Sequence, residues 1–201
     1  MKILVLSDTH LQSFNSPKAD GMNKADAVNF SFFPELLREK IRSADMIVHA
    51  GDFESEDAYK LFAGTGKLKA VFGNRDPESL TKILPEKLVF EQNGLKIGVI
   101  HEAGRSLNDN TARWYILEEM GVDILIYGHI HTPSIDEYKG KFLICPGSPT
   151  KARMSEPSVA EITLADDKPG TVTEIRIIPI GQAACGYLKF REELAERSEK
   201  K

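Results

Sequence analysis

The chain has 201 residues, of which 41% are hydrophobic and 28% charged, and its formal net charge is −4 at neutral pH. This composition is typical of a soluble globular protein and excludes a disordered chain, and the net charge disfavours a broad basic face for nucleic acid. Two cysteines are too few for a disulfide framework, and no apolar stretch reaches the roughly 20 residues that cross a bilayer. We expect a cytoplasmic protein without membrane contact, with a single domain at 1–190 and a charged C-terminal tail at 191–201.

Short apolar runs recur along the chain and predict buried strands. Amphipathic stretches separate the early runs and predict helices, so this part of the chain has the strand-then-helix order of an α/β core. The C-terminal third is strand after strand, which predicts an antiparallel or mixed section, and the polar residues 11–31 predict a long loop. The expected strands are 2–8, 45–52, 67–74, 95–102, 123–129, 141–148, 158–165 and 171–180, and the expected helices are 32–44, 54–63 and 111–120.

Nearly every one of the first five predicted strands ends in a residue that can bind a metal ion. The carboxyl ends of the strands in an open α/β sheet share one edge, and ligands bind there, so we expect these scattered residues to converge. Four of the five histidines of the chain belong to this set. The set is Asp8, His10, Asp52, Asn74, His101, His129 and His131.

The chemistry of this set points to transition metals. Imidazole, carboxylate and amide oxygen together are ligands for Mn, Fe, Zn, Ni or Co, and there is no thiolate to bias the choice. Seven ligands are too many for one catalytic ion that keeps an open position. They suit two ions about 3.5–4 Å apart, bridged by a carboxylate.

The order of these motifs resembles that of the calcineurin-like metallophosphoesterase superfamily. The short chain looks like its small bacterial and archaeal phosphodiesterase branch, which includes relatives of a retromer scaffold subunit. The resemblance covers roughly residues 1–150 and implies a four-layer α/β/β/α sandwich with two mixed β-sheets. The matching motifs are Asp8-Thr9-His10, Gly51-Asp52, Gly73-Asn74-Arg75-Asp76, His101 and Gly128-His129-Ile130-His131.

The resemblance also implies a role for each residue. Asp52 would bridge two divalent transition-metal ions, with Mn as the first choice and Ni, Fe or Zn as alternatives. A metal-bridging hydroxide would attack a small phosphoester, with Asp52, Asn74 and Arg75 in the catalytic set, and Asp76 would orient a neighbouring ligand. The first ion would be held by Asp8, His10 and His131, and the second by Asn74, His101 and His129.

Two positions depart from the family pattern. Many members carry histidine where this chain has Arg75, and that histidine assists the leaving group as an acid. Arginine stays protonated and cannot do so, but it can clamp a phosphate oxygen; the alternative is an exposed arginine in a turn. The branches of the family that act on diesters can lack this histidine, so the resemblance favours diesters as substrates. The second position is Glu102, which follows His101 directly. Its side chain could contact the metal, support a ligand or face solvent, and these three alternatives remain open.

Four further features have alternative interpretations. His49 is predicted to be a hydrogen-bonded core histidine, because it lies three residues before Asp52 and faces the other way in a strand. Residues 146–153 are predicted to form a plain turn, with a wall of the site carrying Lys151 or Arg153 as the alternative. Arg105 is expected either at a substrate phosphate or in solvent. Phe14 and the aromatic residues of 30–33 are predicted to lie in the core rather than in a lid.

We expect a metal-dependent phosphodiesterase or phosphatase acting on a small phosphoester. The alternative is a metal-binding protein-interaction scaffold with weak or no catalysis. A nuclease of the same superfamily is disfavoured by the acidic charge balance and the short chain. Exposed edge strands would permit a homo-oligomer.

Overall fold

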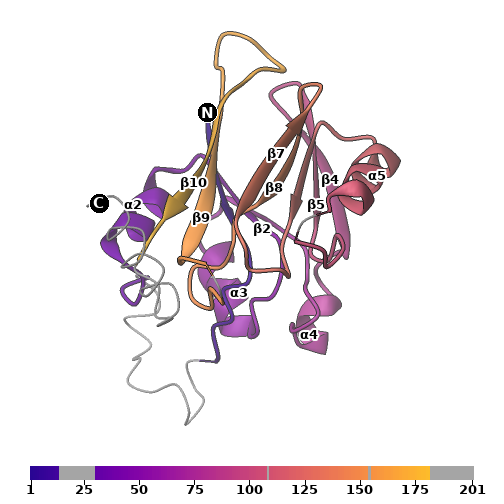
Figure 1. The fold of residues 1–201 in the computed structure, drawn as a ribbon. Coiled ribbons are helices and arrows are strands. Elements are labelled where there is room, and N and C mark those ends of the chain that lie inside the picture. Colours follow the sequence, from indigo (N-terminus) through magenta and orange to yellow (C-terminus); the bar gives the residue numbers. More distant parts are fainter. Residues whose placement is uncertain (14–29, 108, 154, 182–201) are drawn as a thin grey trace, which may run out of the picture.

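The computed structural model describes residues 1–13, 30–107, 109–153 and 155–181. Within them, two five-stranded sheets lie face to face (Figure 1). The predicted tail at 191–201, Phe14 and most of the predicted loop at 11–31 lie outside the described residues. None of the helices in the described part of the chain combines the length and the apolar character that crossing a membrane requires.

The first sheet has the strand order β10-β9-β1-β2-β3. Its centre is parallel, because β1 pairs with β2 and β2 with β3 in the same direction, whereas β9 runs antiparallel to both β1 and β10. Parallel pairing places the ends of β1, β2 and β3 at one edge of the sheet. The strands are β1 (Lys2–Leu6), β2 (Met46–His49), β3 (Leu68–Ala70), β9 (Ser158–Leu164) and β10 (Val172–Pro179).

The second sheet has the strand order β4-β5-β6-β8-β7. Here β5, β6 and β8 are parallel, while the edge strands β4 and β7 are antiparallel to their neighbours. Both sheets are therefore mixed, as expected. The strands are β4 (Lys87–Gln92), β5 (Leu95–Ile100), β6 (Ile124–Tyr127), β7 (Ser134–Tyr138) and β8 (Lys141–Cys145).

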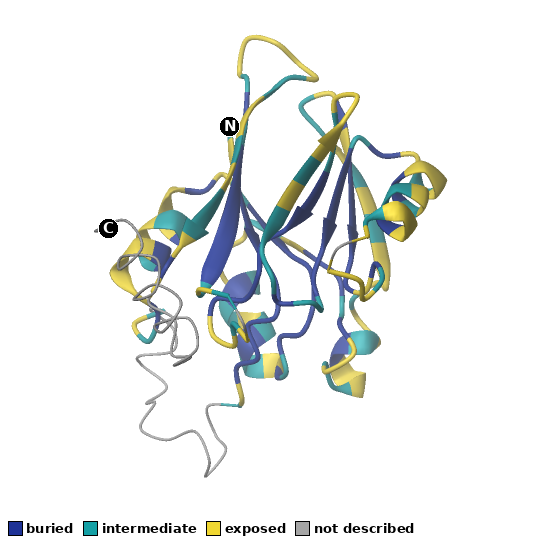
Figure 2. Cartoon of the chain, viewed as in Figure 1, coloured by how far each residue is buried: buried dark blue, intermediate teal, exposed yellow. Residues whose placement is uncertain are grey.

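The core between the sheets is built from β-branched and other aliphatic side chains of both. Ile3 and Val5 of β1 belong to the same buried cluster as Ile97 of β5 and Ile124 of β6. Figure 2 shows these facing strands as buried, with exposed residues on the outer helices. Burial at roughly 25 cal/mol per Å² of apolar area makes this interface a main source of stability.

Helices cover the outer faces of both sheets and complete the four-layer α/β/β/α sandwich (Figure 1). Leu37 of α2, Phe62 of α3 and Leu80 of α4 pack in one cluster with Leu4 and Leu6 of β1. Leu117 of α5 packs against Leu125 and Tyr127 on the outer face of the second sheet. The helices are α2 (Glu35–Ser43), α3 (Glu56–Ala63), α4 (Glu78–Thr81) and α5 (Thr111–Met120).

The predicted elements are all present, although the strands are shorter than expected. β2, for example, ends at His49, and the residues to Asp52 form the turn that carries the site. The sequence analysis missed three elements, which are β4, β7 and the short helix α4. Phe30, Phe32 and Phe33 pack with Phe62 in the core, as predicted.

Candidate metal centre

The seven residues of the predicted set follow five neighbouring strands, three in the first sheet and two in the second. Asp8, Asp52 and Asn74 lie just beyond β1, β2 and β3, and His101 and His129 just beyond β5 and β6. The backbone N–H of His129 donates to Asp8 Oδ2 at 3.0 Å and joins the loops of the two sheets, while that of Gly128 donates to the His101 carbonyl at 3.0 Å within the second sheet. The structure therefore brings together residues that are more than a hundred positions apart.

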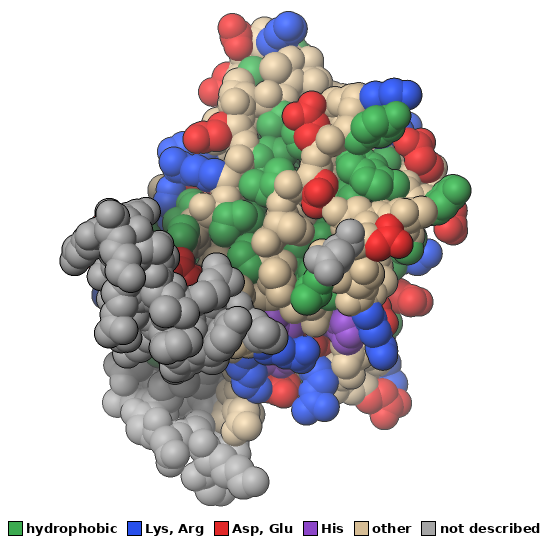
Figure 3. All heavy atoms as spheres, in the orientation of Figure 1, with side chains coloured by type: hydrophobic (Ala, Val, Ile, Leu, Met, Phe, Trp, Pro, Cys, Tyr) green, Lys and Arg blue, Asp and Glu red, His purple; other side chains and the backbone are tan. Residues whose placement is uncertain are grey.

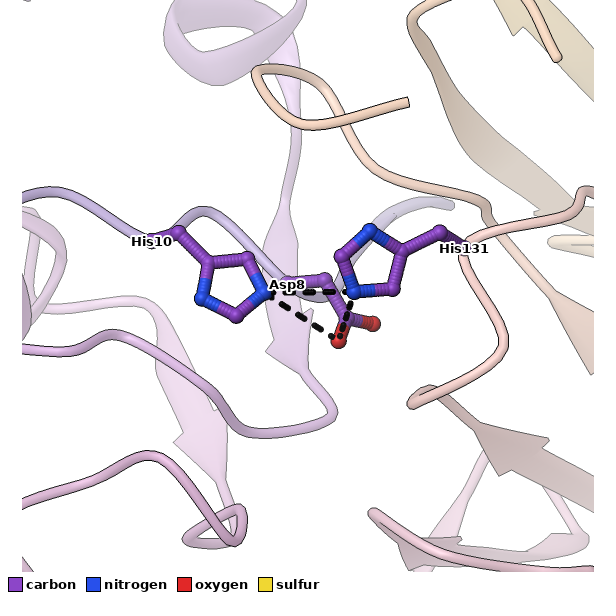
Figure 4. Close-up of side chains that lie close together, drawn as sticks. All are labelled: Asp8, His10 and His131. Atoms are coloured by element: carbon purple, nitrogen blue, oxygen red, sulfur yellow. Dashed lines mark hydrogen bonds and ion pairs between the residues drawn. The ribbon is translucent and has the colours of Figure 1, made fainter. Parts of the chain in front are cut away.

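One group of ligand atoms lies around Asp8 (Figure 4). Asp8 Oδ1 is 3.1 Å from His131 Nε2 and 3.7 Å from His10 Nε2, and the two Nε2 atoms are 3.2 Å apart. The three side chains are buried. Their ligand atoms lie within 4.8 Å of one another, which is the spacing of atoms that surround one ion.

A second group lies on the other side of Asp52. Asp52 Oδ1 is 3.4 Å from His101 Nε2, and Asn74 Oδ1 is 3.0 Å from His101 Nε2 and 2.9 Å from His129 Nδ1. Asp52 Oδ2 is 3.7 Å from His10 Nε2 in the first group. The Asp52 carboxylate thus lies between the two groups, with one oxygen toward each.

The hydrogen bonds of two histidines leave a nitrogen lone pair directed at these carboxylates. His131 donates its Nδ1–H to the Lys151 carbonyl at 2.6 Å, and His101 donates its Nδ1–H to the Ala50 carbonyl at 2.7 Å. In the neutral ring the Nε2 atom is then an acceptor. Such backbone carbonyl partners fix the tautomer and orientation of metal-binding histidines.

Burial and neighbouring charges set the protonation of the centre. Burial works to raise the pKa of Asp8, but nearby His131 and His101 outweigh it, so this pKa lies below its ordinary value. For Asp52, burial acts in the same direction, and His101 outweighs it and lowers the pKa. Burial lowers the pKa of His10. At neutral pH the two carboxylates are therefore ionised and His10 is a neutral imidazole, the forms that bind cations. At His101 the Asp52 carboxylate outweighs burial and raises the pKa.

The backbone around the centre is unusual. Among the described residues, six of the nine non-glycine residues with positive φ belong to this region, with φ between 43° and 75°. Such a conformation is uncommon for a side chain with a Cβ atom, and it clusters at functional sites. The six are Asp8, His10, Asp52, Glu54, His129 and His131.

Asp76 supports the loops that carry the ligands. Its Oδ2 accepts the backbone N–H of Asp52 at 3.0 Å and of Gly73 at 2.8 Å, and its Oδ1 accepts that of Glu54 at 2.8 Å. These bonds tie the turn after β2 to the turn after β3. Asp76 therefore orients the backbone beside Asp52, which agrees with the supporting position expected for it.

His49 is a core residue, as predicted. Its ring stacks on Phe53 with centroids 3.7 Å apart, and it bonds Thr9 Oγ1 at 3.1 Å and the Gly51 backbone N–H at 3.2 Å. Complete burial lowers the pKa of His49 to about 3. It is therefore neutral and supports the turns that follow β1 and β2.

A cavity of about 340 Å³ opens over the two groups. Glu54, at its wall, contacts three neighbours: Lys151 Nζ at 3.0 Å, an Arg75 terminal nitrogen at 3.6 Å and His10 Nδ1 at 3.6 Å. We name this space the metal-side cavity. It is lined by His10, Asp52, Glu54, Asn74, Arg75, His129, His131, Lys151 and Arg153.

The loop at 146–153 forms a wall of this cavity, which corrects the prediction of a plain turn. Ser148 Oγ donates to the Asp8 carbonyl at 2.7 Å, and Thr150 Oγ1 donates to the Thr9 carbonyl at 2.5 Å. Together with the bond from His131 to Lys151, these contacts hold the loop against the centre. Sequence spacing gave no signal for them, because each joins segments that meet only through tertiary packing.

The positions of the remaining charged residues are also defined. Glu102 is exposed and pairs with Arg105 at 2.9 Å, so it lies with solvent rather than among the ligand atoms. The Arg75 side chain is 62% exposed and lines the metal-side cavity, and its backbone N–H donates to Asp52 Oδ1 at 2.7 Å. Arg75 is thus both an exposed turn residue and a cation at the mouth of the cavity.

Comparison with known proteins gives a consistent result. The profile of the calcineurin-like phosphoesterase superfamily domain matches residues 1–167. A probable metallophosphoesterase of Methanothermobacter thermautotrophicus is 31% identical over 191 residues, which cover 95% of this chain and 99% of the relative. A probable metallophosphoesterase of Methanocaldococcus jannaschii is 34% identical over 183 residues, which cover 90% of this chain and 82% of the relative.

Solved structures share the fold at low identity. Vps29 of Entamoeba histolytica, crystallised with zinc, has a TM-score of 0.63 and 20% identity, covering 90% of this chain and 100% of that protein. The structure of a novel archaeal phosphodiesterase has a TM-score of 0.61 and 22% identity, covering 89% of this chain and 99% of that protein. At this level of identity the likeness extends to the fold alone.

Proposed function

The chain belongs to the calcineurin-like phosphoesterase superfamily, and from this premise we propose that it is a binuclear metal-dependent hydrolase of small phosphodiesters. Its relatives named as probable metallophosphoesterases support hydrolysis of phosphoesters, and the archaeal phosphodiesterase of the same fold supports diesters. The binuclear centre, the choice of ion and the substrate class are our proposals.

One observation carries the proposal: acceptor atoms of different side chains face one another at the centre. Asp8 Oδ1 is buried and makes no hydrogen bond within the described residues. Asp8 Oδ1 faces the Nε2 atom of His131, which is an acceptor because Nδ1 carries the proton. Buried acceptors that face one another are costly unless a cation lies between them, so the residues fit metal ions.

We assign the ligands to two ions. Asp8, His10 and His131 would hold the first ion, Asn74, His101 and His129 the second, and Asp52 both. Divalent ions bound there would polarise a phosphoryl oxygen and acidify a water molecule. Nitrogen and oxygen ligands without thiolate suit Mn, with Ni, Fe and Zn as alternatives.

The chain's own residues would position the substrate. Glu54 holds Lys151 and faces Arg75, so two cations lie at the mouth of the metal-side cavity and can pair with the nonbridging oxygens of a phosphate. The cavity volume of about 340 Å³ suits a small ester. Arg75 stays protonated and cannot donate a proton to a leaving group, so esters with poor leaving groups should be hydrolysed slowly.

Hydrolysis of two chromogenic esters tests the proposal. Metal-stripped protein, with Mn²⁺, Ni²⁺, Zn²⁺ or Mg²⁺ added back, is expected to hydrolyse bis-p-nitrophenyl phosphate faster than p-nitrophenyl phosphate. Turnover should disappear without metal and fall strongly in Asn74→Ala, which lacks one ligand of the second ion. Faster turnover of the monoester would overturn the substrate class. No turnover with any ion, although ions bind, would favour a metal-binding interaction scaffold.

A further inference from the structure

A second cavity adjoins the metal-side cavity, and its lining has a different chemistry. Its volume is about 460 Å³, and it shares His129 and Arg153 with the first cavity. A molecule bound at the metal centre can therefore extend into it past His129. We name this space the arginine cavity. It is lined by Arg105, Leu107, His129, Ile130, Thr132 and Arg153.

Both charged residues of this lining are arginines. The metal-side cavity also contains the carboxylates of Asp52 and Glu54, whereas the lining of the arginine cavity contains none. In Figure 3, lysine and arginine side chains lie on this face beside the histidines. A locally cationic cavity in a chain whose net charge is −4 points to an anionic ligand rather than to a general affinity for acidic surfaces.

The loop that carries Arg105 is held in place by a buried arginine. Arg113 of α5 is 2% exposed, and one terminal nitrogen donates to the carbonyls of Gly104 at 3.2 Å and Ser106 at 2.5 Å. Its guanidinium also lies 4.7 Å from the centroid of the Tyr127 ring. Arg113 thereby fixes the backbone on both sides of Arg105, so this side chain projects from an ordered support.

The Arg105 guanidinium retains donors for a ligand. Its Nε–H donates to Glu102 at 2.9 Å, which leaves the terminal amino groups beyond this contact, and the side chain is 77% exposed. Arg105 and His129 line the same cavity, so Arg105 lies beside a residue of the metal centre.

Apolar surface accompanies the two arginines. Leu107 is 61% exposed, and Ile130 is half-buried between His129 and His131. An exposed leucine beside two guanidinium groups suits a ligand that carries both an apolar ring and an anion. A nucleoside joined to a phosphate has this combination.

We propose that the arginine cavity binds a second phosphate of the substrate. This inference rests on the proposed phosphodiesterase function and narrows its substrate class to phosphodiesters in which a nucleoside links the scissile phosphate to another phosphate. The scissile phosphate lies in the metal-side cavity, the nucleoside passes His129 to contact Leu107 and Ile130, and the second phosphate pairs with Arg105 and Arg153.

A matched pair of substrates tests this proposal. One is the p-nitrophenyl ester of thymidine 3′-phosphate, and the other is the same ester with an additional 5′-phosphate. In both, water adds to the phosphorus, the P–O bond to the p-nitrophenyl group breaks and p-nitrophenolate leaves. The metal-loaded protein is expected to hydrolyse the 5′-phosphorylated ester with a kcat/KM about tenfold higher, since charge-assisted hydrogen bonds to arginine are the strong ones.

The ratio of the two kcat/KM values separates the arginine cavity from the rest of the enzyme. In Arg105→Ala and in Arg153→Ala this ratio should fall toward one, whereas Arg42→Ala on the exposed face of α2 should leave it at the wild-type value. A smaller fraction of folded or metal-loaded protein lowers both kcat/KM values equally, because both esters are assayed with the same preparation, so it does not change the ratio. A wild-type ratio of one, or a preference that both arginine variants retain, overturns the proposal while the phosphodiesterase function stands.

Failure of the proposed function has a different signature, which is no hydrolysis of either ester. In that case isothermal titration calorimetry on the metal-loaded protein tests whether the arginine cavity binds a phosphate. The probes are thymidine 3′,5′-bisphosphate and thymidine 3′-monophosphate. Tighter binding of the bisphosphate that is lost in Arg105→Ala supports the arginine cavity as a phosphate site. Equal binding of the two probes overturns it.

Discussion

Replacing Asp52 by asparagine is expected to lower kcat/KM for bis-p-nitrophenyl phosphate by about 10³-fold or more, because a ligand shared by two ions contributes several kcal/mol to transition-state stabilisation. Asp52 has one oxygen toward His101 and the other toward His10. An amide is neutral and offers only one ligand oxygen, so it cannot bridge two ions as a carboxylate does. Steady-state kinetics at saturating Mn²⁺ measures the effect.

The asparagine variant should remain folded. The backbone N–H of Arg75 donates to Asp52 Oδ1 at 2.7 Å, and the amide oxygen of asparagine can accept the same bond. Asp167→Asn, at an exposed position in the loop between β9 and β10, is the matched control and should keep wild-type activity. Activity of Asp52→Asn within tenfold of wild type, at an equal melting temperature, would show that Asp52 does not bridge ions.

Replacing Gly128 by alanine is expected to damage both stability and activity. The added Cβ would lie 2.0 Å from Ser7 Oγ and 2.8 Å from Asp8 Oδ2, which are themselves joined by a hydrogen bond of 2.6 Å. The Ser7 and Asp8 side chains must shift to relieve this clash, and Asp8 is a proposed ligand. Overpacking of this kind costs about 1–3 kcal/mol of unfolding free energy, and misplacement of a catalytic group by roughly 1 Å can cost about 10²-fold in rate.

Urea unfolding and kinetics on the same preparation measure these two losses. The control is Gly181→Ala, where the nearest atom to the added Cβ is 3.9 Å away, and its unfolding free energy should stay within about 0.5 kcal/mol of wild type. If Gly128→Ala matches wild type in stability and turnover, close packing of Gly128 against Asp8 does not position this ligand.

The sequence was sufficient to predict that these side chains come together, because strand ends of parallel sheets converge by topology. Asp8 and Asp52 follow β1 and β2, and His101 and His129 follow β5 and β6, so the hydrophobic pattern alone locates their edge. The sandwich of two mixed sheets came from the family resemblance, and the facing strands bear it out.

The two missed strands lie at sheet edges, where the hydrophobic signal is weak. Residues of β7 are partly or fully exposed, and Asp136 and Glu137 interrupt its apolar pattern. Its stability comes from antiparallel pairing with β8, which no local propensity encodes. β4 likewise alternates exposed and partly buried residues along its length. Both β4 and β7 therefore form because they pair with a neighbouring strand in the folded chain, and not because of their local sequence.

The finer geometry of the site could not be predicted for a related reason. Asp8 and His10 adopt positive φ although neither is glycine, and only contacts from the surrounding loops can impose such a conformation. The bond between His131 and the Lys151 carbonyl, which brings the loop at 146–153 to the cavity, joins residues 20 apart. Residue types and their spacing in the sequence do not determine which loops contact one another in the folded chain.

The number of ions bound per chain tests the central claim most directly. Metal-stripped wild type and its His10→Ala and Asn74→Ala variants would be dialysed to equilibrium against Mn²⁺ and counted by inductively coupled plasma mass spectrometry. We expect two ions in the wild type and one in each variant, since each substitution removes a ligand of a different ion. One ion or none in the wild type at saturating Mn²⁺, or two in both variants, would contradict the assignment of seven residues to a binuclear centre.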